Sequence, residues 1–279
     1  MKQEMNTNHS IAVIMSLYKN DSLEQVKLSV ESILSQTYGS FDFYMQFDGP
    51  ISAHVEEYLL KLKDVRIKIS VRNENKGLAV SLNELLKLVK EKNYEYIARM
   101  DADDISMPNR FEKQIAFLES HPDVDMVGGS INEIDENGYD RGKIARYPCN
   151  PEECRKFFAR RNPVAHPTVM FRRSFFDKAG WAYPTDYVRN EDTRLWHEGY
   201  KRGCVIANIP DVLLNFRMTD SMFKQRRNGL SFAKSQLKLR KLIAKDLGYG
   251  VMAYIYAYAT FLLMISPSWI LKIAYKVLR

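Results

Sequence analysis

Hydrophobic positions in the first hundred residues follow two alternating spacings. Short, nearly continuous apolar runs rich in β-branched and aromatic side chains are typical of strands covered on both faces, and they occupy residues 11–17, 41–47, 65–71 and 94–100. Between these runs, apolar residues recur at the spacing of amphipathic helices, in residues 22–38, 53–62 and 78–89. Repeated strand–helix units predict an α/β fold with a single doubly wound, mostly parallel sheet, because parallel neighbours need crossovers of about this length.

The second half of the chain is less regular. Residues 123–134 read as a strand with two glycines inside it, Gly128 and Gly129, and such glycines usually mark a bulge or the close approach of another backbone. Residues 148–163 contain a predicted helix, and residues 162–171 combine a turn with a strand. A further helix is expected to begin at the acidic pair at positions 191 and 192.

Polar side chains follow the ends of the predicted strands. Ligands of a doubly wound sheet bind beyond the carboxyl ends of its strands. The polar residues expected along that rim are Ser16, Tyr18, Asp48, Arg72, Asp101, Asp103 and Asp104. If these residues belonged to unrelated solvated turns, they would not be expected to converge. The sequence therefore predicts one binding crevice at this edge of the sheet.

The acidic run at the end of the fourth strand is the strongest chemical signal. Crowded carboxylates raise one another's pKa, and a divalent cation such as Mg²⁺ or Mn²⁺ neutralises them. The structural alternative is an acidic turn that caps the helix beginning near Pro108. The chain has no Gly-x-Gly-x-x-Gly after its first strand and no Gly-x-x-x-x-Gly-Lys loop, which argues against dinucleotide dehydrogenases and P-loop hydrolases. A cation on Asp101 and Asp103 is therefore predicted to neutralise a diphosphate.

Two further polar positions allow both a functional and a structural interpretation. His166 lies between prolines and is a candidate contact for an acceptor or a phosphate; the alternative is a buried histidine whose ring is satisfied by the backbone. Glu191 and Asp192 either interact with the dipole of the helix that they begin or include a general base.

Composition indicates one large domain with an appendage. Of the 279 residues, 46% are hydrophobic, which suffices for a substantial core. The formal charge is +7, and residues 224–245 carry eight Lys or Arg and no acid. Such a segment suits phosphate or an anionic membrane surface, with a solvated helix face as the alternative. The three cysteines match no zinc spacing, and with a polar N-terminus they indicate a cytoplasmic protein without a signal peptide.

The C-terminal tail has no charged side chain between residues 247 and 271. About 20 apolar residues can span a bilayer, but Pro267 interrupts the run, and Trp269 with the lysines that follow it is typical of a membrane interface. We expect a helix over residues 249–265, a bend and a second amphipathic helix to residue 279, lying against the inner leaflet. The alternatives are a single transmembrane anchor, or a tail packed on the catalytic domain or on a partner subunit of a homodimer.

Several ordered segments resemble family 2 glycosyltransferases of the GT-A fold. They are residues 14–18, 32–38, 48–50, 75–79, 99–104, 191–192 and 195–196. They span about residues 10–220, and an ordered set is more specific than any one motif. Residues 47–50 and 162–173 are most similar to bacterial transferases that build exopolysaccharides, capsules and O-antigens, such as those of the amylovoran type. We therefore divide the chain into a GT-A domain over residues 1–222 and a helical, membrane-associated tail over residues 223–279.

The resemblance implies roles for the polar residues of the rim. Tyr18 would stack on the base of the nucleotide while Asp48 accepts a hydrogen bond from the ring nitrogen, a pairing that favours uracil. Where many relatives carry two aspartates, this chain has Phe47 and Asp48, so only Asp48 is carried over. The other predicted contacts of the nucleotide-sugar are Ser16, Arg72, Asn75, Lys76 and Asp101.

The resemblance also implies the catalytic groups. Asp101 and Asp103 would bind Mn²⁺ or Mg²⁺, with Asp103 as the direct ligand. Asp192 would deprotonate the acceptor hydroxyl, with Glu191 as the second candidate, and the anomeric carbon would invert in a single displacement. A cation suits a diphosphate leaving group, and a base suits a sugar hydroxyl.

The sequence thus predicts an inverting, metal-dependent hexosyltransferase that uses a nucleotide-sugar, first of all a UDP-sugar. Its acceptor would be a glycan or lipid-linked glycan at the cytoplasmic face of the inner membrane, and no nucleic-acid partner is expected. One alternative is a sugar-nucleotide pyrophosphorylase, although the N-terminal turn lacks the glycine-rich basic loop of such enzymes. The other is a non-catalytic membrane scaffold, against which the retained aspartates argue.

Overall fold

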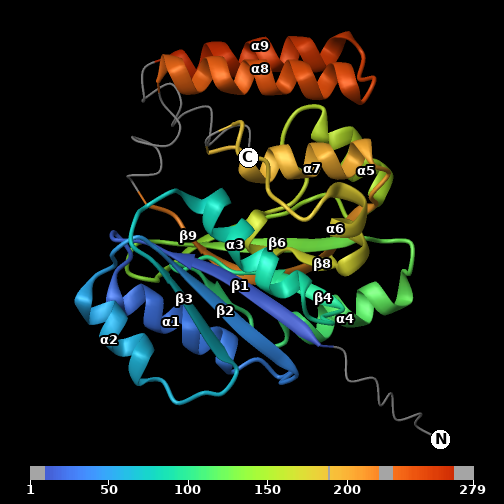
Figure 1. The fold of residues 1–279 in the computed structure, drawn as a ribbon. Coiled ribbons are helices and arrows are strands. Elements are labelled where there is room, and N and C mark those ends of the chain that lie inside the picture. The colour runs from blue at the N-terminus through green and yellow to red at the C-terminus, as the bar shows by residue number, and fades with distance from the viewer. Residues whose placement is uncertain (1–9, 188, 220–228, 267–279) are drawn as a thin grey trace, which may run out of the picture.

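The protein has a mixed α/β fold in which helices cover both faces of a curled, mostly parallel sheet (Figure 1). The computed structural model describes residues 10–187, 189–219 and 229–266. Two further helices lie side by side at one end of the molecule. The predicted fold class is confirmed.

The first half of the sheet is entirely parallel, as the sequence predicts. Its strands are β1 (Ile11–Leu17), β2 (Phe41–Asp48), β3 (Ile67–Arg72) and β4 (Tyr96–Arg99), and they lie side by side in the order β3-β2-β1-β4. The third strand begins two residues later than expected, because Val65 is solvent-exposed before the chain enters the sheet. Parallel order places the carboxyl ends of all four strands at one edge.

The second half adds antiparallel pairs to this sheet. The order continues through β8 (Met170–Arg172), β6 (Met126–Ile134), β9 (Ile206–Arg217) and β5 (Ile105–Ser106), with β7 (Asp140–Ala145) on the side of β6. The longest pairing, β6 with β9, is parallel, and its register shifts next to Gly129. A Cβ added to Gly128 or Gly129 would lie 2.6 Å from a side chain of β9. The bulge that these glycines predict is therefore confirmed by the register shift, and side chains of β9 fill the space beside both glycines.

Alternate residues of the central strand β1 enter two separate hydrophobic cores. Val13 and Met15 belong to the core beneath one face, whereas Ala12 and Ile14 belong to the core beneath the other. The helices over the first core are α1 (Leu23–Leu34), α2 (Ala53–Lys61) and α4 (Arg110–Ser120). Those over the second are α3 (Leu78–Lys90), α5 (Pro151–Phe158), α6 (Arg173–Ala179) and α7 (Glu191–Lys201). Burial of both faces explains why β1 is a continuous apolar run.

The C-terminal layer consists of α8 (Leu230–Asp246) and α9 (Val251–Ile265), of which α9 is the helix predicted over residues 249–265. Leu239 and Ile243 of α8 enter the second core, so this helix packs directly on the catalytic domain. Within the described residues, no helix is both long enough and apolar enough to cross a bilayer. The predicted second amphipathic helix, with Trp269, lies outside the described residues, as do Lys224, Arg226 and Arg227.

Candidate active site

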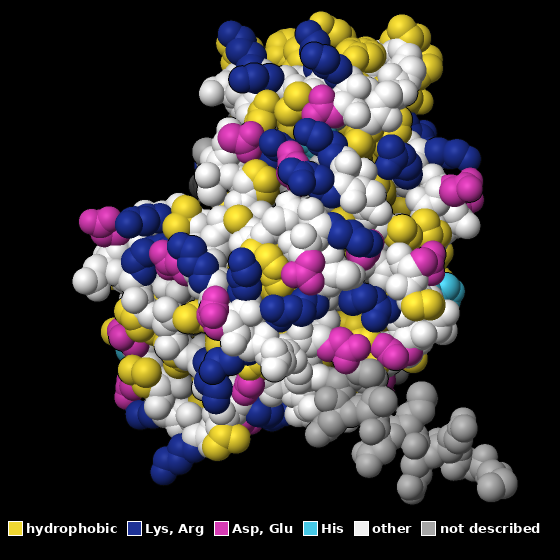
Figure 2. Space-filling view, turned by 45° about the vertical axis from the view of Figure 1, so that its right-hand side comes forward, with side chains coloured by type: hydrophobic (Ala, Val, Ile, Leu, Met, Phe, Trp, Pro, Cys, Tyr) yellow, Lys and Arg dark blue, Asp and Glu magenta, His cyan; other side chains and the backbone are white. Residues whose placement is uncertain are grey.

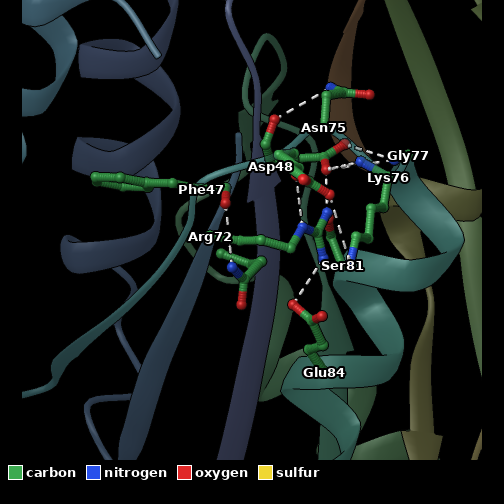
Figure 3. Close-up of polar contacts among 10 residues, drawn as sticks. Phe47, Asp48, Arg72, Asn75, Lys76, Gly77, Ser81 and Glu84 are labelled. Carbon is green, nitrogen blue, oxygen red and sulfur yellow. Dashed lines mark hydrogen bonds and ion pairs between the residues drawn. The ribbon is translucent and has the colours of Figure 1, made fainter. Parts of the chain in front are cut away.

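The carboxyl ends of β2 and β3 bring Asp48 and Arg72 together, as Figure 3 shows. The two residues are partners in the strand register and form an ion pair in which the Asp48 side chain is only 4% exposed. Asp48 Oδ1 also accepts a hydrogen bond of 2.7 Å from the backbone N–H of Lys76, and Oδ2 accepts one of 2.9 Å from the backbone N–H of Gly77. The carboxylate thereby fixes the loop that begins α3.

Arg72 is equally well held. Its guanidinium donates to Glu84 Oε2 at 2.7 Å, to Ser81 Oγ at 2.9 Å and to the carbonyl of Glu74 at 2.8 Å (Figure 3). An ionised carboxylate has about four acceptor positions, and the contacts of Asp48 fall mostly on Oδ1. Among these contacts, Oδ2 accepts only the bond from the backbone N–H of Gly77.

Gly49 allows the turn after β2 to pack against the loop before α3. Its φ is 79°, and a Cβ at this position would lie 2.6 Å from the backbone nitrogen of Asn75. The Asn75 side chain in turn donates to the carbonyl of Asp48 at 3.1 Å. The predicted nucleotide contacts Asp48, Arg72, Asn75 and Lys76 therefore form one connected structure.

Ser16 and Tyr18 lie at the end of β1, between the ends of β2 and β4. Both side chains are partly exposed. The backbone N–H of Tyr18 donates to Asp21 Oδ2 at 2.8 Å, which fixes the turn that carries the ring. The structure thus places these two predicted contacts on the same rim as Asp48.

The acidic run after β4 divides into a buried residue and two partly exposed ones. Asp104 is buried, and its Oδ1 accepts a hydrogen bond of 2.8 Å from the backbone N–H of Arg217. Burial and the nearby charges of Asp103 and Asp101 hold the pKa of Asp104 well above its usual range. Asp104 therefore connects the run to the end of β9, whereas Asp101 and Asp103 reach the rim.

Arg99 holds the first acid of this run from beneath. Its buried guanidinium forms an ion pair with Asp101, whose side chain is 32% exposed. Arg110, which is also buried, donates at 2.9 Å to the carbonyl of Arg99. The described residues contain no group of three or more side chains that could hold a metal ion by themselves. Two carboxylates are nevertheless sufficient for Mg²⁺ or Mn²⁺ when phosphates and water complete the coordination.

A second pair of carboxylates begins α7. Arg189, just before them, has φ of 63°, and such a conformation in a non-glycine residue is often found at functional sites. Asp192 Oδ2 accepts a hydrogen bond of 2.9 Å from Asn162 Nδ2, and Oδ1 accepts one from the backbone N–H of Thr193. Arg240 donates to Asn162 Oδ1 at 3.3 Å. Burial raises the pKa of Asp192, while these donors and the charge of Arg240 oppose that rise.

Glu191 connects this pair to the acidic run. Burial, followed by the charge of Asp192, raises the pKa of Glu191 to about 7. Arg99 lowers this pKa and Asp101 raises it further, so both residues are close enough to act on Glu191. Glu191 therefore lies near enough to Asp101 and Arg99 for their charges to act on its ionisation.

His166 lies beneath this site and is held by a side chain. Its Nε2 is 3.1 Å from the hydroxyl of Tyr183, and its ring packs edge-on against Trp196. The backbone-bonded histidine considered from the sequence is therefore not what the structure shows. Burial, and then the charge of Arg99, lowers the pKa of His166 to about 3, so the ring is neutral at physiological pH.

Sequence reasoning missed the side chains that hold residues of the candidate site in place. Asn83 forms two hydrogen bonds with the backbone of Tyr183, at 2.6 and 2.9 Å, across 100 positions of the sequence. Asn162 and Arg240 support Asp192 in a similar way. No local pattern marks these residues, because each partner comes from a distant element.

Comparison with known proteins agrees with this geometry. Residues 12–180 match the family described as glycosyl transferase family 2. The chain belongs to this family. The amylovoran biosynthesis glycosyltransferase AmsE of Erwinia amylovora is 34% identical to this family 2 glycosyltransferase over 241 residues, which are 85% of this chain and 88% of AmsE. The predicted family and enzyme class are confirmed, and the pyrophosphorylase and the non-catalytic scaffold are set aside.

Two further proteins bear on the fold and the chemistry. The UDP-Gal:alpha-D-GlcNAc-diphosphoundecaprenol beta-1,3-galactosyltransferase of Escherichia coli is 28% identical, over 81% of this chain and 80% of its own. The solved structure of the mannosyltransferase PcManGT from Pyrobaculum calidifontis, in complex with GDP-Man and Mn²⁺, superposes with a TM-score of 0.60 at 15% identity. The superposition covers 96% of this chain and 79% of the PcManGT chain. This family 2 glycosyltransferase therefore has the GT-A fold.

Proposed function

We propose that this family 2 glycosyltransferase transfers a sugar from a UDP-sugar to a hydroxyl of a lipid-linked glycan during synthesis of a bacterial surface polysaccharide. The polysaccharide is suggested by AmsE, and the donor and the lipid-linked acceptor are suggested by the E. coli galactosyltransferase. The observation that carries the proposal is the convergence of three groups on one rim: the Asp48–Arg72 pair, the acids after β4 and the acids that begin α7.

The donor binds across the ends of the first four strands in this proposal. Tyr18 stacks on the base, and Asp48 Oδ2 accepts the ring N–H of uracil. Asp101 and Asp103 hold Mn²⁺ or Mg²⁺, and the bound cation neutralises the charge that develops on the diphosphate leaving group. Of the two, Asp103 is proposed as the direct ligand, as the resemblance to the family implies.

Asp192 is the proposed general base. The Asn162 and Thr193 donors orient its carboxylate, and the charge of Arg240 favours the ionised form that a base requires. As Asp192 removes the proton, the acceptor oxygen attacks the anomeric carbon from the side opposite the diphosphate, which inverts the configuration. Glu191 is the second candidate, since a pKa of about 7 also suits base catalysis near neutral pH.

Donor binding tests this proposal directly. We would titrate UDP, GDP and dTDP into the protein by calorimetry, with Mn²⁺ and then with EDTA. The expected result is tight binding of UDP that requires both the metal and Asp103, so that Asp103→Ala binds weakly. Asp123→Ala, which removes an exposed aspartate outside the rim, is the matched control and should bind normally. Preference for GDP or dTDP would refute the proposed donor, and metal-independent binding would refute the role of Asp103.

A further inference from the structure

Helix α9 presents an apolar surface to solvent. It has no charged side chain over its 15 residues, and Ala253 and Ala257 are its only buried residues. Val251 is 72% exposed and Leu262 is 59% exposed. Figure 2 shows hydrophobic side chains at the top of the molecule, where Figure 1 places this helix. An exposed apolar surface of this kind usually marks a binding surface.

Helix α8 adds a row of positive charge beside this surface. Its exposed lysines recur at intervals of three or four residues, at Lys234, Lys238, Lys241 and Lys245. With aromatic side chains, among them Phe261 and Tyr254, they line two shallow hollows of about 360 and 430 Å³ along the two helices. Lys241 Nζ lies 3.4 Å from the hydroxyl of Tyr258 on α9. Lysines and aromatic rings therefore lie together beside the apolar surface.

The opposite face of α8 reaches the active site. At about 100° per residue, the four lysines point about 140–200° away from Gln236. Gln236 donates to the side chain of Asn190 immediately before the acidic pair, and Arg240 donates to Asn162. One helix thus contacts the residues around Asp192 through Gln236 and Arg240 and carries the exposed lysine row on a different side.

We propose that the layer formed by α8 and α9 docks this enzyme on the surface of an anionic lipid bilayer. The lysines contact anionic headgroups, and the apolar side chains of α9 enter the boundary between headgroups and acyl chains. A 15-residue helix is about 22 Å long, whereas the hydrocarbon core is about 30 Å thick, so α9 lies along the surface. The proposal goes beyond the transfer reaction and assigns the membrane contact expected from the sequence to specific side chains.

Charge favours a bilayer over a second copy of the chain. In a symmetric dimer the same surface faces itself, so two lysine rows would lie close together and repel each other. Anionic headgroups have the complementary charge, and each lysine near such a surface strengthens binding about fivefold at low salt. The surface thus fits lipid better than it fits itself.

Vesicle sedimentation tests whether the lysines of α8 contribute to membrane binding. The full chain is mixed at low salt with vesicles of phosphatidylcholine containing about 30 mol% of the anionic lipid phosphatidylglycerol, and with vesicles of phosphatidylcholine alone. We expect sedimentation with the anionic vesicles only. Lys234→Glu/Lys238→Glu/Lys241→Glu should bind roughly 100-fold more weakly or worse, since three attractive charges are lost. The control, Lys63→Glu/Lys87→Glu/Lys92→Glu, makes the same charge change at exposed positions elsewhere and should lose less than about tenfold.

The same assay tests whether the apolar side chains of α9 contribute to membrane binding. Ile255→Ser/Leu262→Ser should weaken binding at least about tenfold, because it removes apolar area that enters the bilayer. Leu60→Ser/Leu88→Ser changes equally exposed apolar side chains on other helices and should bind normally. Unchanged thermal midpoints by circular dichroism show that the variants fold. Sedimentation requires no turnover, so this test can fail while donor binding succeeds.

Three results would overturn the proposal. The first is an intact chain that stays in solution with anionic vesicles. The second is a lysine variant that binds as well as its control. The third is a dimer, measured by light scattering, that Ile255→Ser/Leu262→Ser converts to a monomer while vesicle binding is absent; a second copy would then be the partner of α9.

Discussion

The ionisation of Glu191 makes the free energy of unfolding depend on pH, and a single substitution should reveal this dependence. Its carboxyl group is largely buried beside Asp192, which raises its pKa from 4.5 to about 7. A carboxyl whose pKa is raised by folding stabilises the folded state below the unfolded pKa. That contribution is lost as the pH rises through the folded pKa. Glu191→Gln keeps the shape of the side chain and removes its ionisation.

The magnitude follows from the two pKa values. Each pH unit between them corresponds to about 1.4 kcal/mol, so ionised Glu191 costs the folded state about 3 kcal/mol at pH 8. Most of this cost arises between pH 5 and pH 8. The free energy of unfolding of Glu191→Gln, relative to the original protein, should therefore increase by about 2 to 3 kcal/mol over that range.

Urea unfolding at pH 5, 6, 7 and 8 measures this difference. EDTA is included so that no cation neutralises the neighbouring Asp101. Glu112→Gln, at an exposed position in the first turn of α4, is the control and should show a nearly constant difference. If the free energies of unfolding of Glu191→Gln and of the original protein fell in parallel from pH 5 to pH 8, the raised pKa inferred for Glu191 would be wrong.

Two other substitutions give independent tests. Asp192→Asn should lower turnover about 10²- to 10⁴-fold with UDP affinity unchanged, because the proposed base acts on the acceptor. If Asp192→Asn kept ordinary turnover and Glu191→Gln were inactive, Glu191 would be the base instead. Gly49→Ala should destabilise the protein by at least about 1 kcal/mol, since its φ is 79° and its new Cβ would lie 2.6 Å from the Asn75 nitrogen. Thermal unfolding measures this, and Gly39→Ala, where no atom lies within 4 Å, should have little effect.

The order of the elements and the rim of the site could be predicted from the sequence. Burial can be recognised from the local sequence, because a strand such as β1 that is covered on both faces is apolar at nearly every position. Parallel order then places the ends of β1 to β4 at one edge, so the sequence alone predicts that Asp48, Arg72 and Asp101 lie along one rim.

The roles within the acidic run depended on tertiary structure. Asp101, Asp103 and Asp104 are alike in the sequence, yet only Asp104 is buried and bonded to the backbone of Arg217, 113 positions away. Contacts of this kind depend on how β5 lies against β9. A local pattern contains no information about such a partner.

The sequence by itself determined the alternation of strands and helices, the carboxylates at the strand ends and the ordered motifs of the family, because each depends on residues close together in the chain. Only the tertiary structure decided which side chains support Asp192 and that α8 joins the catalytic domain. Those features arise when residues 30 or more positions apart pack together, and packing selects partners by shape and charge in three dimensions.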